Sequence, residues 1–387
     1  MSRAGWELTT LGQYCEVFSG YPFKSIGFTD DPNDIPLVKG ENIGQGEVLW
    51  DISKRWPIQD LAELERYKLI KGDVVLAMDR PWVPAGLKFA KITASAPDAL
   101  LVQRVARLRG LKGLDQSFLA QLIASPSFVG YVQSVGRGVG VPHISSKEIG
   151  AFTFWLPPLM EQEKIGNTLS AYDDLIDNNR RRMALLEDSA RQLYREWFVR
   201  LRFPGHEHTP IVDGVPQGWE RAPLESALVL QRGFDLPTQD RQDGEVPIYG
   251  STGILGHHNQ AKAAAPGVVT GRSGTLGEVQ YVDQDYWPLN TALWVKGFKR
   301  VTPLFALFLL REMDLKQFNG GASVPTLDRK SVHRVDVLIP STQMLRAFDE
   351  FAVDVFAQVK KLASQNQKLR QARDLLLPRL MNGELAV

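Results

Sequence analysis

The chain contains the same set of short segments twice, in the same order. The four pairs are Gly5-Trp6-Glu7 with Gly218-Trp219-Glu220, Ile35-Pro36-Leu37 with Val246-Pro247-Ile248, Gly72-Asp73-Val74-Val75 with Pro266-Gly267-Val268-Val269, and Val141-Pro142-His143-Ile144 with Val324-Pro325-Thr326-Leu327. The offset falls from 213 residues at Trp6 and Trp219 to 183 at Pro142 and Pro325, and then stays constant. This pattern indicates one unit written twice, with shorter loops in the second copy. The alternative, two unrelated domains with similar strands and turns, does not predict a common order.

Each copy mixes strands and helices. Apolar runs such as 73–77 and 267–270 lie between Gly, Pro and Asp turns and predict strands. Segments 117–123 and 302–310 predict helices that are capped by the hydroxyl groups of Ser117 and Thr302. The sequence therefore predicts an α+β fold in which two mixed α/β domains are separated by a two-helix coiled coil. The expected parts are domains 1–158 and 218–341, a spacer helix 159–200, a linker 201–217 and a C-terminal spacer helix 342–387.

Both spacer helices carry an apolar seam whose residues are spaced alternately by four and three, as in a coiled coil. The first seam is Ile165, Leu169, Tyr172, Ile176, Asn179, Met183, Leu186, Ala190, Leu193 and Trp197. A shift of 183 gives the second, which is Phe348, Ala352, Val355, Val359, Leu362, Asn366, Leu369, Arg373, Leu376 and Leu380.

One interior asparagine interrupts each seam, Asn179 in the first and Asn366 in the second. If the helices run antiparallel with their midpoints aligned, the two asparagines face each other and fix the register. Alternatively, both lie at a solvated edge of the seam. Antiparallel pairing would create a pseudo-twofold axis and place the two domains at opposite ends of a spacer. A ligand with two separated, oppositely oriented half-sites fits that arrangement, and duplex DNA is such a ligand.

The composition sets limits on function. With 45 Lys and Arg against 44 Asp and Glu, the net charge is +1, so the overall charge does not by itself indicate a nucleic-acid binder. The single cysteine, Cys15, excludes an intramolecular disulfide and a multi-cysteine zinc site. The chain has no run of about 18 uncharged apolar residues and no hydrophobic stretch near Met1, so we expect a cytoplasmic protein.

Motifs that would indicate catalysis are not found. The glycine-rich segments 136–138 and 271–274 lack the lysine and hydroxyl of a phosphate-binding loop. The one Pro-Pro pair, Pro157-Pro158, lies between leucines and does not match the motif of amino-methyltransferases. His257-His258 does not indicate a metal site because adjacent histidines rarely converge on one ion, and His206-Glu207-His208 lies in a Pro/Gly-rich linker. We therefore expect no catalytic residue and no metal in this chain.

The chain carries several distinctive segments, which are Leu156-Pro157-Pro158-Leu159, Glu161-Gln162-Glu163-Lys164-Ile165, Tyr172-Asp173-Asp174-Leu175-Ile176-Asp177-Asn178-Asn179, Trp197-Phe198-Val199 and Leu377-Pro378-Arg379-Leu380-Met381-Asn382-Gly383-Glu384-Leu385. With these as its most specific segments, the chain resembles, over essentially its whole length, the specificity subunits of type I restriction-modification systems. Less specific are Val38-Lys39-Gly40-Glu41-Asn42-Ile43 and Lys71-Gly72-Asp73-Val74-Val75. The second copy has Tyr249-Gly250-Ser251-Thr252-Gly253 in place of the first of these, so its contacts cannot be transferred from the first copy.

The resemblance implies a non-catalytic subunit with two target-recognition domains, each reading one half of a bipartite duplex DNA target. It implies two methyltransferase subunits docked on the helices and a restriction subunit that translocates DNA. S-adenosylmethionine, ATP and Mg would belong to those partners. The length of the helices would set the gap between the half-sites.

Polar loop residues beside glycine turns are the candidates for contact with bases. They are Lys39, Asn42, Arg80, Trp82, Arg137 and His143 in the first copy and Ser251, Thr252, His257, His258, Arg272 and Ser273 in the second. Candidates for contact with phosphates are Lys54, Arg55, Lys88 and Lys330.

Two alternatives remain open. The chain could be the specificity subunit of a type II enzyme with a fused nuclease-methylase, which sequence barely separates from type I. It could also be a coiled-coil scaffold whose globular ends bind protein.

Overall fold

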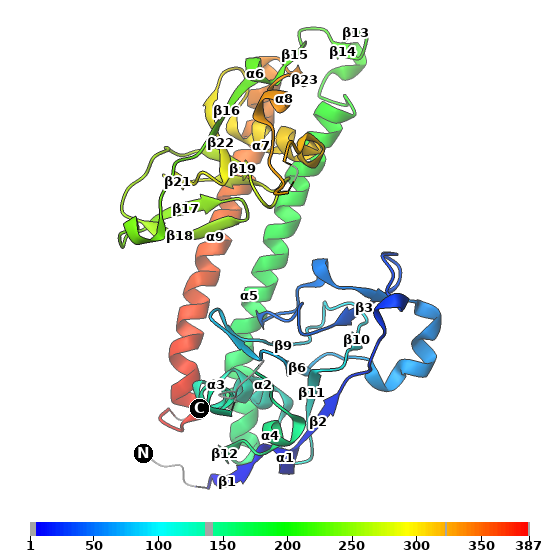
Figure 1. The fold of residues 1–387 in the computed structure, drawn as a ribbon, viewed down its shortest axis with the longest axis vertical. Helices are drawn as coiled ribbons and strands as arrows, with labels where there is room; N and C mark the ends of the chain where they lie inside the picture. The colour runs from blue at the N-terminus through cyan, green and yellow to red at the C-terminus, as the bar shows by residue number, and fades with distance from the viewer. Residues whose placement is uncertain (1–4, 136–141, 322, 386–387) are drawn as a thin grey trace. The chain divides into compact units, whose positions relative to one another are not determined.

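The computed structural model describes residues 5–135, 142–321 and 323–385. The chain divides into two compact units, Met1–Asn178 with Gln365–Val387, and Asn179–Ser364 (Figure 1). Each unit contains one of the two domains expected from the sequence and a segment of each long helix.

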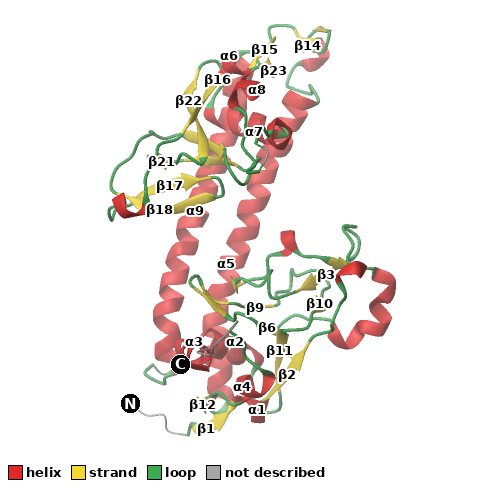
Figure 2. Ribbon diagram, in the orientation of Figure 1, coloured by secondary structure: helices red, strands yellow, loops and turns green. Residues whose placement is uncertain are grey.

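In its described residues, the first unit has a sheet with strand order β2-β11-β6-β9-β4, a smaller sheet with order β10-β3-β5, and the pairs β1-β12 and β7-β8 (Figure 2). Its strands are β1 (Glu7–Thr10), β2 (Cys15–Ser19), β3 (Ile35–Val38), β4 (Gln45–Gly46), β5 (Arg55–Trp56), β6 (Val74–Ala77), β7 (Trp82–Val83), β8 (Gly86–Leu87), β9 (Phe89–Lys91), β10 (Leu100–Leu101), β11 (Val105–Gly110) and β12 (Thr153–Leu156). Its shorter helices are α1 (Leu11–Tyr14), α2 (Gln116–Ala124), α3 (Pro126–Val135) and α4 (Ser146–Gly150).

The described part of the second unit has sheets with orders β16-β22-β19-β20 and β18-β17-β21, and the pairs β15-β23 and β13-β14. Its strands are β13 (Ile211–Val212), β14 (Val215–Pro216), β15 (Glu220–Pro223), β16 (Leu228–Arg232), β17 (Val246–Gly250), β18 (Gly253–His258), β19 (Gly267–Gly271), β20 (Val279–Val282), β21 (Trp287–Pro288), β22 (Ala292–Phe298) and β23 (Asp336–Ile339). Its shorter helices are α6 (Leu224–Ala227), α7 (Pro303–Glu312) and α8 (Arg329–His333). The pair β13-β14 lies within the segment that the sequence left as a linker.

The duplication extends to strand order and register. The order β2-β11-β6-β9 in the first unit matches β16-β22-β19-β20 in the second, and neighbouring strands in both are antiparallel. Glu7 pairs with Leu156, and Glu220 pairs with Ile339, so each position differs from its counterpart by the offset read from the sequence. The prediction of one unit written twice is confirmed.

The predicted helix caps were half right. Thr302 caps α7, since its hydroxyl accepts a hydrogen bond from Phe305 N at 3.3 Å, and Pro303 is the first helical residue. Ser117 does not cap α2. The helix begins two residues earlier, at Gln116, and the N-cap residue Asp115 accepts from Phe118 N at 2.8 Å. The physical reason is that an aspartate at the N-cap likewise accepts from a free backbone N–H of the first turn and also interacts favourably with the helix dipole.

The long helices are α5 (Leu159–Tyr194), which continues into a π-helical turn (Arg195–Val199), and α9 (Thr342–Met381). Every position of both predicted seams is buried or half-buried. In the first unit Arg373 Nη1 of α9 lies 2.7 Å from Asp173 Oδ1 of α5. In the second, the rings of Trp197 and Phe348 lie 6.5 Å apart. In the first unit Arg373 faces Asp173, while the lower-numbered Asn366 faces the higher-numbered Ile176, so α5 and α9 are antiparallel in that unit (Figure 1, green and red).

The interior asparagines of the seams are both buried, Asn179 at 7% and Asn366 at 2% exposure. The expectation of a solvated edge is therefore wrong. Asn366 Nδ2 donates to the carbonyl oxygen of Ile176 at 3.1 Å. Their direct pairing with each other stays a prediction.

Each unit has its own apolar core, to which both long helices contribute. In the first unit Ile165 and Leu169 of α5 and Leu380 of α9 join the core under β1 and β12. In the second, Ala190 of α5 and Phe348 of α9 join the core around α7. Among the described residues, no helix combines the length and hydropathy needed to cross a membrane.

Candidate nucleic-acid interface

The segment that follows β6 in the first unit is held by backbone hydrogen bonds on both sides. Met78 N donates to Arg104 O at 2.9 Å, Ile144 N to Met78 O at 2.8 Å, and Arg80 N to Pro142 O at 2.7 Å. We call these three bonds the strand-end frame. They fix the backbone that carries Arg80 and His143, two of the residues singled out from the sequence.

The second unit contains the same frame after β19. Arg272 N donates to Thr291 O at 2.9 Å, Leu327 N to Arg272 O at 2.8 Å, and Gly274 N to Pro325 O at 2.9 Å. Each partner is the repeat equivalent of its counterpart in the first unit. The bridge between Asp79 and His143 likewise returns between Ser273 and Thr326. The two units therefore present equal backbone frames with different side chains.

On the first frame, Asp79 joins the side chains of an arginine and a histidine. Arg104 Nη1 donates to Asp79 Oδ2 at 2.8 Å, and His143 Nδ1 lies 2.7 Å from Asp79 Oδ1. Burial alone would raise the pKa of Asp79, but the hydrogen bonds from Arg104 and His143 outweigh it and hold this pKa below its ordinary value. The carboxylate therefore stays charged and keeps both partners in place.

Arg80 and Trp82 lie exposed next to this cluster. Trp82 begins the small β7-β8 pair and keeps 39% of its surface accessible. Arg80 has a left-handed backbone, with φ at 45°. An exposed guanidinium can hydrogen-bond with a base, and an exposed indole can stack on one.

The loop after β3 packs against the same frame. Lys88 Nζ, half-buried, donates to the carbonyl oxygen of Gly40. Lys39 Nζ pairs with Glu41 at 2.8 Å. Burial lowers the pKa of Lys88; the nearby Glu41 opposes this shift and the positive charge of Arg80 adds to it. The structure thus brings Lys39, Lys88 and Arg80 together.

Asn42 has a supporting role. Its side chain is 1% exposed, donates to Leu37 O at 3.0 Å and to Ser53 Oγ at 2.6 Å, and accepts from Lys39 N at 2.7 Å. These bonds shape the loop that presents Lys39 and leave the amide no access to a base. Arg137, the remaining candidate of this copy, lies outside the described residues.

In the second unit Ser251 and Thr252 form the turn between β17 and β18. A Cβ built on Gly271, at the end of β19, would lie 3.0 Å from the carbonyl oxygen of Ser251, so this turn packs against the frame. His257 is exposed on β18. His258 is buried, accepts from Gln242 N at 3.1 Å and packs on Trp287, which makes it a supporting residue.

A basic groove of about 470 Å³ opens beside the second frame. Its charged lining comprises Arg232, Arg272, Asp328, Arg329 and Lys330. Arg272 Nη1 donates to Asn290 O at 3.2 Å, which holds the guanidinium at the wall of the groove. Ser273 directly follows Arg272 in the chain, on the frame itself. Such a groove suits an anionic backbone.

Two of the phosphate candidates lie away from the frames. Arg55, on β5, donates from Nη1 to Asp34 O at 2.7 Å, and half-exposed Lys54 lies 3.7 Å from Asp30. Lys88 and Lys330, in contrast, lie beside the frames.

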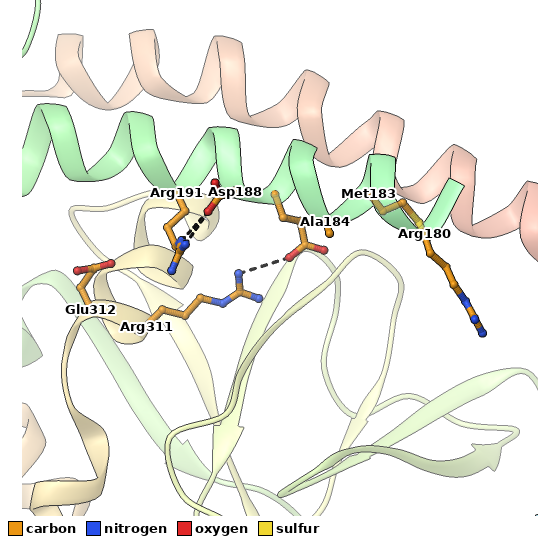
Figure 3. A pocket seen from close by; sticks show the side chains of 8 residues that line it. Arg180, Met183, Ala184, Asp188, Arg191, Arg311 and Glu312 are labelled. Carbon is orange, nitrogen blue, oxygen red and sulfur yellow. Dashed lines mark hydrogen bonds and ion pairs between the residues drawn. The ribbon is translucent and has the colours of Figure 1, made fainter. Parts of the chain in front are cut away.

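A larger open groove, of about 630 Å³, runs between α5 and α7 of the second unit (Figure 3). Its charges are paired: Arg191 with Asp188 at 2.6 Å, and Arg311 with Glu187 at 3.5 Å. Its lining includes none of the residues predicted to contact DNA. We therefore place the candidate interface on the frames.

Sequence reasoning missed two residues of the first frame, Asp79 and Arg104. The repeat could have indicated Asp79, because it occupies the position of Ser273. Arg104 gave no sequence signal, since no glycine or proline marks its turn; its φ of 63° appears only in the structure.

Among the described residues, no group of three or more His, Cys, Asp or Glu side chains is placed to share a metal ion. Of the histidines considered for metal binding, His206 instead lies with Nδ1 2.9 Å from the carbonyl oxygen of Phe203.

Residues 3–188 match the family model described as the type I restriction modification DNA specificity domain. The chain is 31% identical to the type I restriction enzyme HindI specificity subunit of Haemophilus influenzae, over 98% of this chain and 99% of that relative. It is 36% identical to the EcoAI specificity subunit of Escherichia coli over 44% of this chain, which spans only 28% of that relative's length. Another relative, the MjaVIII specificity subunit of Methanocaldococcus jannaschii, is 27% identical over 49% of this chain and 44% of its own length.

The fold is shared with the crystal structure of a type I restriction-modification system S subunit from M. genitalium. The TM-score is 0.58 at 16% identity, and the match covers 98% of this chain and 97% of that one. This likeness concerns the fold, whereas the nearly full-length identity to the Haemophilus influenzae protein establishes the family. The chain belongs to the family of type I restriction-modification specificity subunits.

Proposed function

We propose that this chain is the DNA-recognition subunit of a type I restriction-modification complex and that each unit reads one half of a bipartite duplex target. The strand-end frame is the observation that carries this proposal. The same three backbone hydrogen bonds recur in both units, while the side chains on them differ. Equal frames would dock on DNA in the same way, and different side chains would read different bases.

The proposed contacts follow from exposure and position. In the first unit they are Lys39, Arg80, Trp82 and His143, with Lys88 toward the phosphates; Arg137 stays a proposed contact. In the second they are Ser251, Thr252, His257, Arg272 and Ser273, with Lys330 toward the phosphates. Asn42 and His258 are assigned to loop support because both are buried. A net charge of +1 is compatible with this role because some basic side chains gather locally, as in the groove beside the second frame.

The chemistry of the complex is assigned to partners. We propose that two methyltransferase subunits bind S-adenosylmethionine, and that restriction subunits use ATP and Mg to translocate and cut DNA. The complex would act in the cytoplasm, where its DNA is found. Mass spectrometry of the complex purified from its host tests this assignment: separate methyltransferase and translocase chains support it, and one fused nuclease-methylase chain contradicts it.

We also propose that the number of heptads in α5 and α9 sets the gap between the half-sites. Deletion of seven residues from each helix should shorten the preferred gap and leave both half-site sequences unchanged. Sequencing of methylated sites in cells expressing the complex measures both. A changed half-site with an unchanged gap would contradict the spacer role.

The central test is selection of bound DNA from a random library by the chain with its methyltransferase subunits. We expect two short conserved blocks separated by a gap of fixed length, and a footprint over both. A single contiguous block, or binding without sequence preference, would contradict the proposal.

A further inference from the structure

Arg80 occupies a backbone conformation that its residue type disfavours. Its φ is 45°, in the left-handed region where a Cβ crowds the backbone. The equivalent position in the second unit is Gly274, with φ at 86° and open space where a Cβ would be. The frame therefore requires a left-handed residue, and glycine is the unstrained choice. An arginine at this position costs conformational free energy that a glycine would not.

The frame itself does not need the arginine side chain. Arg80 contributes its backbone N–H to Pro142, a bond that Gly274 makes equally well to Pro325. Within residues 5–135, 142–321 and 323–385, the Arg80 guanidinium makes no hydrogen bond and no ion pair, and it is exposed. Backbone strain at a residue whose side chain does not stabilise the fold indicates that the side chain has a role in binding.

The surroundings of Arg80 leave its guanidinium available to hydrogen-bond acceptors of a ligand. Lys88 lies near enough for the charge of Arg80 to disfavour its protonation. The neighbouring carboxylate, Asp79, is already occupied on both oxygens by Arg104 and His143. The positive charges of Arg80 and Lys88 are thus only partly offset, and the groups that could neutralise Arg80 are engaged elsewhere.

We propose that Arg80 is a specificity-determining residue of the first unit and donates both of its terminal guanidinium N–H groups to O6 and N7 of a guanine in the major groove. This inference rests on the proposed function. A base edge is favoured over a phosphate because a bidentate contact requires a fixed Cα direction, which the frame provides. A phosphate accepts a contact from any exposed basic side chain, and Lys39 and Lys88 already supply such groups.

The test uses the full chain with its methyltransferase subunits and a DNA library randomised in the first half-site. The wild-type complex should prefer guanine at one position by about 10-fold or more. In Arg80→Gly that preference should fall to within about 2-fold, with the other positions and the second half-site unchanged. Arg80→Lys should not restore it, because an ammonium cannot make the planar pair of bonds.

A matched control separates recognition from strain. Asp213 has φ at 51° in the turn between β13 and β14, and it belongs to neither frame. Both Arg80→Gly and Asp213→Gly should raise the thermal midpoint or leave it unchanged, but only the first should alter base preference.

The outcomes distinguish this inference from the function on which it rests. If the wild-type complex bound DNA without sequence preference, the proposed function itself would be contradicted. A wild-type preference that survives in Arg80→Gly, or a uniform loss of affinity for all sequences that Arg80→Lys restores, would overturn only the guanine contact.

Discussion

The side-chain amide of Asn366 in α9 donates a hydrogen bond to the carbonyl oxygen of Ile176 in α5, across the helix pair of the first unit. Asn366→Leu should leave the thermal midpoint unchanged or raise it, because Ile176 lies inside a helix and its carbonyl can keep its helical bond. Asn366→Asp should cost about 3 kcal/mol by burying a carboxylate against that oxygen. Thermal or urea unfolding measures both. A loss in Asn366→Leu as large as in Asn366→Asp would show that the amide contributes stability rather than register.

Asp173 joins three helices of the first unit. Its Oδ1 accepts from Arg373 of α9 at 2.7 Å and its Oδ2 from the buried Gln121 of α2 at 3.0 Å. Asp173→Ala should destabilise the chain by about 2 kcal/mol, because it leaves both donors without this partner. Asp174→Ala, at the exposed neighbouring position, should change the unfolding free energy by less than about 0.5 kcal/mol. If both variants changed the unfolding free energy equally in urea, the two hydrogen bonds of Asp173 would contribute no stability.

Gly166, the glycine inside α5, lies against the start of α2. An added Cβ would meet Phe118 N at 2.7 Å and the Ser117 carbonyl carbon at 2.9 Å, both backbone atoms. Gly166→Ala should therefore destabilise by about 2 kcal/mol despite the better helix propensity of alanine. Gly130→Ala in α3, where a Cβ meets open space, should stabilise by about 0.5–1 kcal/mol. If both variants gained stability, the close approach of α2 and α5 would be wrong.

Asp349 of α9 gives the second unit a pH dependence of defined sign. Burial raises its pKa above the ordinary 3.8, and the hydrogen bond that its Oδ1 accepts from Thr302 opposes the shift only in part. A raised folded-state pKa means that ionisation costs stability as the pH rises through it. Asp349→Asn should therefore raise the unfolding free energy at pH 7, and the gain should shrink as the pH falls toward 4. Glu350→Gln, at the exposed next residue, serves as the control. A gain that does not vary with pH would contradict this assignment.

The repeated architecture was predictable because its signals are local and periodic. The offsets between equivalent segments agree with the strand register, in which Glu7 pairs with Leu156 and Glu220 with Ile339, and the seam spacing anticipated which positions of α5 and α9 are buried. The cap of α2 was missed because Asp115 and Ser117 are both good capping residues, and the choice depends on where the chain leaves β11.

The candidate interface was predictable only in part. The polar residues found beside glycine turns include Arg80 and Arg272, and the structure places each of them on a strand-end frame. They also include Asn42 and His258, which the structure buries, since turn composition does not tell which way a side chain points. Arg104 was missed because its role depends on a contact with Asp79, 25 residues away, which no local pattern encodes.

The strand-end frames depend on backbone hydrogen bonds, and each is completed within its own unit. Substitutions on one frame can therefore accumulate without altering the other and without rebuilding a core. Because nearly independent sites contribute additively to the binding free energy, any variant of one frame can be combined with any variant of the other. If each frame could recognise about ten half-sites, the pairs would recognise on the order of a hundred targets.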